Sequence, residues 1–128
     1  MIRIELDGWY SVPKKRPRVT RNGTYMPHGY TDWKQETAYQ MRKAWGQPPI
    51  EGTLGVAIEL VARKRPRGDV DNLAGAVLDA GNGVLWVDDR QIAALSVAWL
   101  KPADHRSEGI NVEVALWDPQ MRSCQDDR

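Results

Sequence analysis

Four aspartates in the middle of the sequence have the residue type and spacing of a metal-binding site. Asp69 and Asp71 lie two residues apart, and Asp88 and Asp89 follow about twenty residues later. In an extended segment, side chains two residues apart point the same way. A strand–helix–turn–strand unit of this length folds back on itself, which can bring the second pair beside the first.

Carboxylates gathered in one place repel one another unless a cation neutralises them, and their oxygens suit Mg²⁺ or Mn²⁺. Such a cation lowers the pKa of a bound water and neutralises the charge that builds up on a phosphate during phosphodiester hydrolysis. No covalent enzyme intermediate is then required. The alternative is structural, because Asp69 or Asp71 can be a helix N-cap and Asp88-Asp89 can form a turn.

The charge of the chain is divided between its two halves. Residues 1–67 hold 13 Lys and Arg against 6 Asp and Glu, whereas residues 68–128 hold 5 against 11, so that +7 and −6 give the net charge of +1. A basic half is typical of a polyanionic partner, although ordinary surface charge is the alternative. Two basic clusters are predicted to bind nucleic-acid phosphates: Lys14, Lys15, Arg16, Arg18 and Arg21 in the first, and Arg63, Lys64, Arg65 and Arg67 in the second.

The elements that must position these residues form an α+β domain that spans residues 1–128. Alternating apolar residues predict strands over 2–6, 54–60, 92–99 and 110–116, and helical spacing predicts helices over 33–45 and 73–80. Thr31 or Asp32 is the expected cap of the first helix. The order β-α-β-α-β-β indicates a small mixed sheet with two helices on one face. Residues 13–23 are predicted to be an extended loop with a turn, and residues 119–128 a frayed polar tail.

Composition narrows the class of protein further. The hydrophobic fraction of 41% and charged fraction of 27% are near the averages for globular chains. The apolar runs are far shorter than a membrane span requires, and the first seven residues alternate unlike a signal peptide. The single cysteine, Cys124, cannot form an internal disulfide, which favours a reducing, cytoplasmic setting. Periodicity assigns Trp33, Trp45, Trp86 and Trp117 to core or dimer positions.

Three segments in this order resemble the RusA family of Holliday junction resolvases, which are bacterial and often prophage-encoded endonucleases. They are the basic segment 13–33, the segment 69–83 that begins Asp-Val-Asp-Asn-Leu, and the segment 86–95 that begins Trp-Val-Asp-Asp-Arg-Gln. The resemblance implies a homodimer that cuts four-way DNA junctions with Mg²⁺ or Mn²⁺ by paired, symmetric nicks. It implies catalytic and metal-binding roles for Asp69, Asp71 and Asp89, with Asp88 as a further metal ligand. No membrane or small-molecule cofactor is expected, and the expected setting is the cytoplasm of a bacterial or phage-infected cell. Recombination, repair and phage DNA processing each fit this activity.

One departure from the family pattern affects the expected chemistry. Gly75 stands where the family has a lysine four residues after the second aspartate, and Trp99 stands where many members have another lysine. A glycine supplies no charge, and it weakens a helix by up to about 1 kcal/mol relative to alanine. Three alternatives follow: another cation substitutes, activity is reduced, or the protein binds branched DNA with weak or lost cleavage. The candidate substitutes are Arg67, Arg90 and Lys64, and the lysine nearest to Trp99 is Lys101.

Overall fold

The computed structural model describes residues 1–7, 18–20, 23–25, 28–66, 68–103 and 108–120, with side chains for residues 1–6, 32–66, 68–103 and 108–120. The strands are β1 (Ile2–Asp7), β2 (Arg18–Thr20), β3 (Gly23–Tyr25), β4 (Leu54–Val61), β5 (Ile92–Leu100) and β6 (Gly109–Leu116). The helices are α1 (His28–Trp45), α2 (Val70–Gly81) and the short 3-10 helix η1 (Asp89–Gln91).

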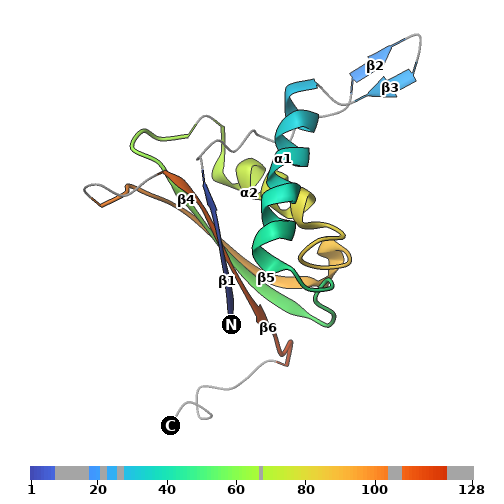
Figure 1. Ribbon diagram of the computed structural model, residues 1–128, viewed down its shortest axis with the longest axis vertical. Coiled ribbons are helices and arrows are strands. Elements are labelled where there is room, and N and C mark those ends of the chain that lie inside the picture. The colour runs from blue at the N-terminus through green and yellow to red at the C-terminus, as the bar shows by residue number, and fades with distance from the viewer. Residues whose placement is uncertain (8–17, 21–22, 26–27, 67, 104–107, 121–128) are drawn as a thin grey trace.

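Four strands form a mixed sheet in the order β1-β6-β4-β5. β6 pairs antiparallel with both β1 and β4, whereas β4 and β5 are parallel. Figure 1 shows α1 and α2 on the same side of this sheet. The predicted α+β class, the mixed sheet and the placement of both helices on one face are therefore confirmed.

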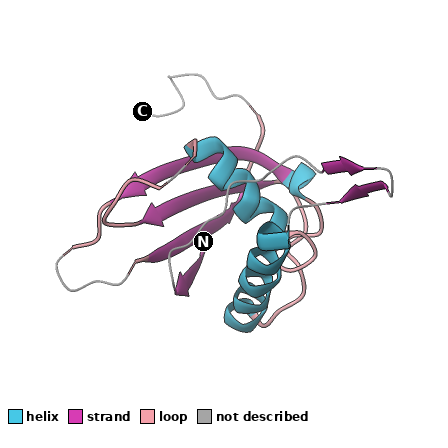
Figure 2. Ribbon diagram, turned by 90° about the horizontal axis from the view of Figure 1, so that it is seen from above, coloured by secondary structure: helices cyan, strands magenta, loops and turns pink. Residues whose placement is uncertain are grey.

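A second, two-stranded sheet pairs β2 with β3 antiparallel, with Arg18 opposite Tyr25 and Thr20 opposite Gly23. This hairpin projects away from the main sheet (Figure 2). The sequence predicts an extended loop with a turn here, but it does not predict that the two strands pair. Asn-Gly at positions 22–23 is a strong signal for a hairpin turn, but the flanking segments are too basic to show clear apolar alternation.

The core lies between the sheet and the two helices. Leu54, Val56, Ile58 and Leu60 alternate with less buried residues along β4, and their side chains pack with those of α2 in one buried cluster. Trp86, in the segment between α2 and η1, is fully buried in the same cluster. Burial of each large apolar side chain stabilises the fold by about 1.5–3 kcal/mol. The prediction of a core position for Trp86 is confirmed, and Trp33 and Trp45 pack against the core while partly exposed.

Helix α1 begins at His28, five residues before the predicted start at Trp33. Thr31 and Asp32 therefore lie inside the helix, and the prediction that one of them caps it is wrong. Gly29 lowers the intrinsic helix propensity of this turn by about 1 kcal/mol, but helices in proteins are stabilised mainly by tertiary packing. The predicted end is confirmed: Gly46 has a φ of 63° and donates its backbone N–H to the Arg42 carbonyl at 2.9 Å.

The β4–α2–β5 unit determines where the candidate site residues lie. Because β4 and β5 are parallel, the chain must cross from the end of β4 back to the start of β5, and α2 makes this crossing. The N-terminus of α2 therefore lies toward the edge of the sheet where β4 and β5 end, and its C-terminus toward the edge where β5 begins (Figure 1). No helix among the described residues is long and apolar enough to cross a membrane.

Candidate active site

Asp69 and Asp71 occupy the N-terminal end of α2. Asp69 is the N-cap residue, with φ −77° and ψ 145°, and its backbone carbonyl accepts a hydrogen bond from Leu73 N at 3.0 Å. Its side chain makes no capping hydrogen bond. Asp71 lies in the first helical turn, so the prediction of one extended segment is wrong: the helix begins at Val70 rather than at Leu73. Both side chains are exposed, and the helix dipole favours negative charge at this end.

Asp88 and Asp89 form the turn before β5, as the structural alternative predicts. Asp88 is the N-cap of η1, and its Oδ1 accepts a hydrogen bond from Arg90 N at 2.9 Å. Asp89 Oδ2 accepts a hydrogen bond from Asn82 Nδ2 at 3.5 Å, and Asn82 Oδ1 accepts one from the indole of Trp86 at 3.0 Å. The turn is thereby attached to the C-terminal end of α2.

Gln91 holds this turn in place, a role that the sequence interpretation missed. Its Oε1 accepts hydrogen bonds from the backbone N–H groups of Val87 and Asp88, at 2.8 and 3.0 Å. Its Nε2 donates to the carbonyls of Ile50 and Gly52, at 2.8 and 2.9 Å. The signal was available, because an N-cap aspartate followed three residues later by glutamine is typical of a capping box.

The two acidic pairs lie at opposite ends of α2. A helix of 12 residues is about 18 Å long, at 1.5 Å per residue. Across the described part of the chain, no three His, Cys, Asp or Glu side chains form a group that could hold a metal ion. Within one chain, Asp88 and Asp89 therefore do not lie beside Asp69 and Asp71. The sequence spacing allows a return of the chain, but a complete helical crossing carries Asp88 and Asp89 to the other edge of the sheet.

The second basic cluster lies in the connection from β4 to α2, on the same side as Asp69 and Asp71. The backbone N–H of Arg63 donates to Glu108 Oε2 at 2.7 Å, and its guanidinium lies 3.9 Å from the same carboxylate. Lys64 and Arg65 are exposed. Four residues of the first cluster, Lys14, Lys15, Arg16 and Arg21, lie outside the described residues, as does Arg67. Arg18 belongs to β2, where its backbone is opposite Tyr25.

Gly75 lies on α2 one turn after Asp71, and residues four apart share a helix face. A Cβ atom built at Gly75 would meet nothing within 4 Å. The position where the family resemblance predicts a lysine therefore has open space at Cβ, where a side chain would begin. Arg90, one of the possible substitute cations, is exposed at the opposite end of α2, in the turn that contains Asp89.

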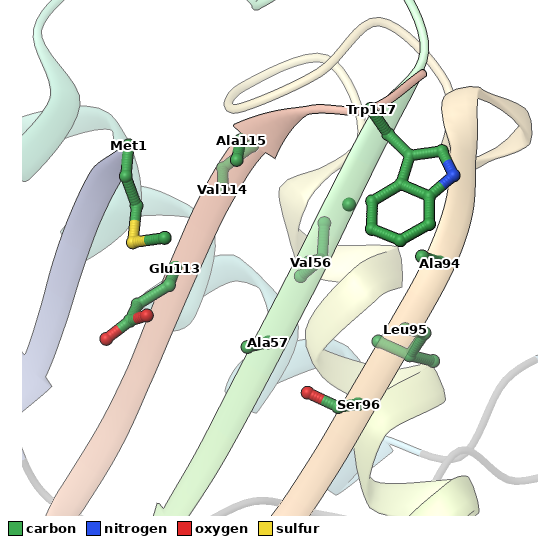
Figure 3. A pocket seen from close by; sticks show the side chains of 11 residues that line it. Met1, Val56, Ala57, Ala94, Leu95, Ser96, Glu113, Val114, Ala115 and Trp117 are labelled. Atoms are coloured by element: carbon green, nitrogen blue, oxygen red, sulfur yellow. The ribbon is translucent and has the colours of Figure 1, made fainter. Parts of the chain in front are cut away.

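A hollow of ≈ 330 Å³ on the outer face of the sheet is lined mainly by small and apolar side chains. Figure 3 shows the indole of Trp117 at one end of it and Glu113 on β6, the strand that ends just before Trp117. Trp117 is 47% exposed, so its predicted core position is wrong, and its dimer position stays a prediction. Glu113 forms an ion pair with Arg3, which also contacts Glu5 and Glu59. Hydrogen bonds to Glu5 and Glu113 raise the pKa of Arg3. None of the four aspartates lines this hollow, so it is not the candidate site.

Comparison with known protein families identifies a match. A search of curated proteins finds nothing similar to the chain. The family model of endodeoxyribonuclease RusA matches residues 9–115. The matched segment contains all four aspartates and both basic clusters, and it spans most of the 128 residues. The chain therefore belongs to the RusA endodeoxyribonuclease family.

Proposed function

We propose that the protein is a metal-dependent, structure-specific endonuclease that resolves Holliday junctions by paired, symmetric hydrolysis of phosphodiester bonds. The observation that carries this proposal is the pair Asp69 and Asp71, exposed at the N-terminal end of α2 directly after a cluster of exposed basic residues. In a chain of an endodeoxyribonuclease family, exposed carboxylates that follow basic side chains support a site where metal ligands would adjoin groups that bind a DNA backbone. The substrate, branched DNA, would be met in the cytoplasm of a bacterial or phage-infected cell.

Asp69, Asp71 and Asp89 are the residues that would hold Mg²⁺ or Mn²⁺, with Asp88 as a further ligand. Hard divalent cations of this kind prefer carboxylate oxygens, and the exposed carboxylates of Asp69 and Asp71 fit that preference. The ion would supply a water of lowered pKa and would neutralise charge on the phosphate. Arg63, Lys64 and Arg65 would hold the DNA strand against these carboxylates.

The separation of the two acidic pairs supports a homodimeric site. We infer that each site takes Asp69 and Asp71 from one chain and Asp89 from a second copy, because α2 separates the pairs within one chain by about 18 Å. A two-fold symmetric dimer then has two identical sites. Two sites related by this symmetry are suited to two symmetric nicks in a four-way junction.

The test of this function uses a labelled synthetic four-way junction and a matched linear duplex, each with Mg²⁺, Mn²⁺ or EDTA. The expected result is paired nicks in the junction alone, which EDTA abolishes. Asp71→Asn is expected to abolish nicking and to leave binding of the junction unchanged. Gly75 favours a second candidate, a branched-DNA-binding protein with weak or lost cleavage. A junction that is shifted in a gel but never nicked would establish that candidate and overturn the first.

Gly75→Lys is expected to raise the rate of junction nicking about tenfold, part of the 100–1,000-fold that a well-placed electrostatic donor contributes. The new side chain would begin in open space at Cβ and lie on the same face of α2 as Asp71. Gly75→Gln is the matched control, because it adds a chain of similar length without the charge. If the lysine and glutamine variants nick at the same rate as the parent, another cation already serves this role.

A further inference from the structure

Two cations lie over one indole ring at the end of β5. The guanidinium carbon of Arg65 is 5.6 Å from the centroid of the Trp99 ring, and the Nζ of Lys101 is 5.8 Å from it. Arg65 belongs to the connection that follows β4, and Lys101 directly follows β5. Attraction to the face of an indole within about 6 Å stabilises each cation. Trp99 thus holds together two charges from separate parts of the chain.

The ring itself has a fixed position. Trp99 is partly buried, and its Nε1 donates a hydrogen bond to the Ala62 carbonyl at 2.8 Å. The backbone N–H of Ala62 in turn donates to the Leu100 carbonyl at 3.0 Å, which continues the pairing of β4 with β5. The indole is therefore attached to the backbone at the point where the connection that carries Arg65 begins.

The charges of Arg65 and Lys101 have no acidic partner among the residues with described side chains, where ion pairs involve Arg3, Lys34 and Arg63. Both cations lie within 6 Å of the same ring centroid, and like charges gathered at one ring repel each other. An anion that accepts hydrogen bonds from both would remove this repulsion. A phosphate group suits such a pair, since guanidinium and ammonium groups both donate to its oxygens.

The pair also lies toward the same edge of the sheet as Asp69 and Asp71. β4 and β5 are parallel with Val61 opposite Leu100, so the residues that follow both strands meet at one edge. The connection from β4 that contains Arg65 leads directly to the N-terminus of α2. A DNA strand whose phosphate is held by Arg65 and Lys101 would therefore run toward these carboxylates.

We propose that Arg65 and Lys101 form a two-cation clamp for a phosphate of the DNA backbone, and that Trp99 is the positioning residue of this clamp. The inference rests on the proposed nuclease function and names the part of the substrate that this edge of the sheet binds. Side chains two residues apart along a strand point the same way, so Lys101 brings its charge to the face from which Trp99 projects.

The test measures binding of a labelled four-way junction in EDTA, where no cleavage occurs, over a series of salt concentrations. The variants are the double substitution Arg65→Gln with Lys101→Gln, and Trp99→Leu. The control is Arg42→Gln with Lys43→Gln, which removes two exposed charges from the last turn of α1. Log K falls with log salt, and each lost phosphate contact lowers the magnitude of this slope by about 0.9.

The clamp variant is expected to lose about two phosphate contacts and so to lower the magnitude of this slope by about 1.8. The α1 control is expected to leave the slope unchanged. Trp99→Leu is expected to lower the slope although it removes no charge, which a purely structural role for the ring would not do. Thermal unfolding shows whether Trp99→Leu is folded. If it is not, Trp99→Phe replaces it in the test. This variant keeps an aromatic face and is expected to retain the parental slope. Equal slopes for the clamp variant and the control overturn the clamp while the nicking assay still decides the nuclease function. Salt-independent binding by the parent overturns both.

Discussion

Dimers that combine one Asp71→Asn chain with one Asp89→Asn chain are expected to nick a four-way junction, whereas dimers of either variant alone are inactive. If each site takes Asp71 from one chain and Asp89 from the other, the mixed dimer has one site with both substitutions and one site with none. The intact site should cut one strand at about half the total nicking rate of the parent, which has two sites. Paired resolution should be lost, since the second site is damaged.

This experiment requires co-expression of the two chains with different tags, so that mixed dimers are purified directly. The matched control combines Asp71→Asn with the double variant Asp71→Asn, Asp89→Asn, a pairing that leaves no intact site in either arrangement. Inactivity of the first mixed dimer would contradict a shared site. If each site were built within one chain, both sites of this dimer would carry one substitution and neither would be intact. A purified parent that is monomeric at micromolar concentration would contradict it as well.

Gly81→Ala is expected to reduce the free energy of unfolding by about 2–4 kcal/mol, a large effect for one methyl group. A Cβ atom at Gly81 would lie 2.5 Å from Cζ2 and 2.9 Å from Cε2 of the Trp86 ring. The ring has little freedom to move, because Trp86 is fully buried and its indole N–H donates to Asn82. Either the helix or the ring must shift, and both belong to the core.

Gly75→Ala is the matched control, because it makes the same chemical change in the same helix where nothing lies within 4 Å. It is expected to stabilise the protein by up to about 1 kcal/mol, since alanine favours a helix more than glycine does. Urea unfolding with an unchanged m-value measures both differences. A Gly81→Ala variant as stable as the parent would show that the Trp86 ring can move aside without loss of packing.

The sequence predicts the main sheet well, because alternation of apolar residues follows directly from having one buried face. The order along the chain of the four main-sheet strands and the two helices, the end of α1 at Gly46 and the core position of Trp86 are confirmed. The start of α1 could not be read in the same way, since His28 to Tyr30 have no strong helix propensity and depend on the packing of the rest of the helix. Pairing of β2 with β3 likewise depends on a turn rather than on an apolar pattern.

The candidate site shows that the spacing of residues in the sequence does not determine which of them lie together in the fold. The sequence predicts two pairs of aspartates with a helix between them, but it does not reveal that this helix crosses the sheet and leaves the pairs at its opposite ends. The contributions of Gln91 and Trp99 depend on partners distant in sequence, Ile50 and Gly52 for the one and Ala62 and Arg65 for the other. Such contacts follow from the parallel arrangement of β4 and β5, which no local pattern encodes.

The four hydrogen bonds of the Gln91 amide also affect the thermodynamics of ligand binding at the turn before β5. Fixing the backbone of a flexible residue costs about 1–2 kcal/mol of conformational entropy. The backbone N–H groups of Val87 and Asp88 are already bonded to Gln91, and Gln91 is bonded to the segment around Ile50. The ordering of this turn is thus part of the folding free energy. A ligand that reaches Asp89 meets a preorganised carboxylate and does not have to order the loop that carries it.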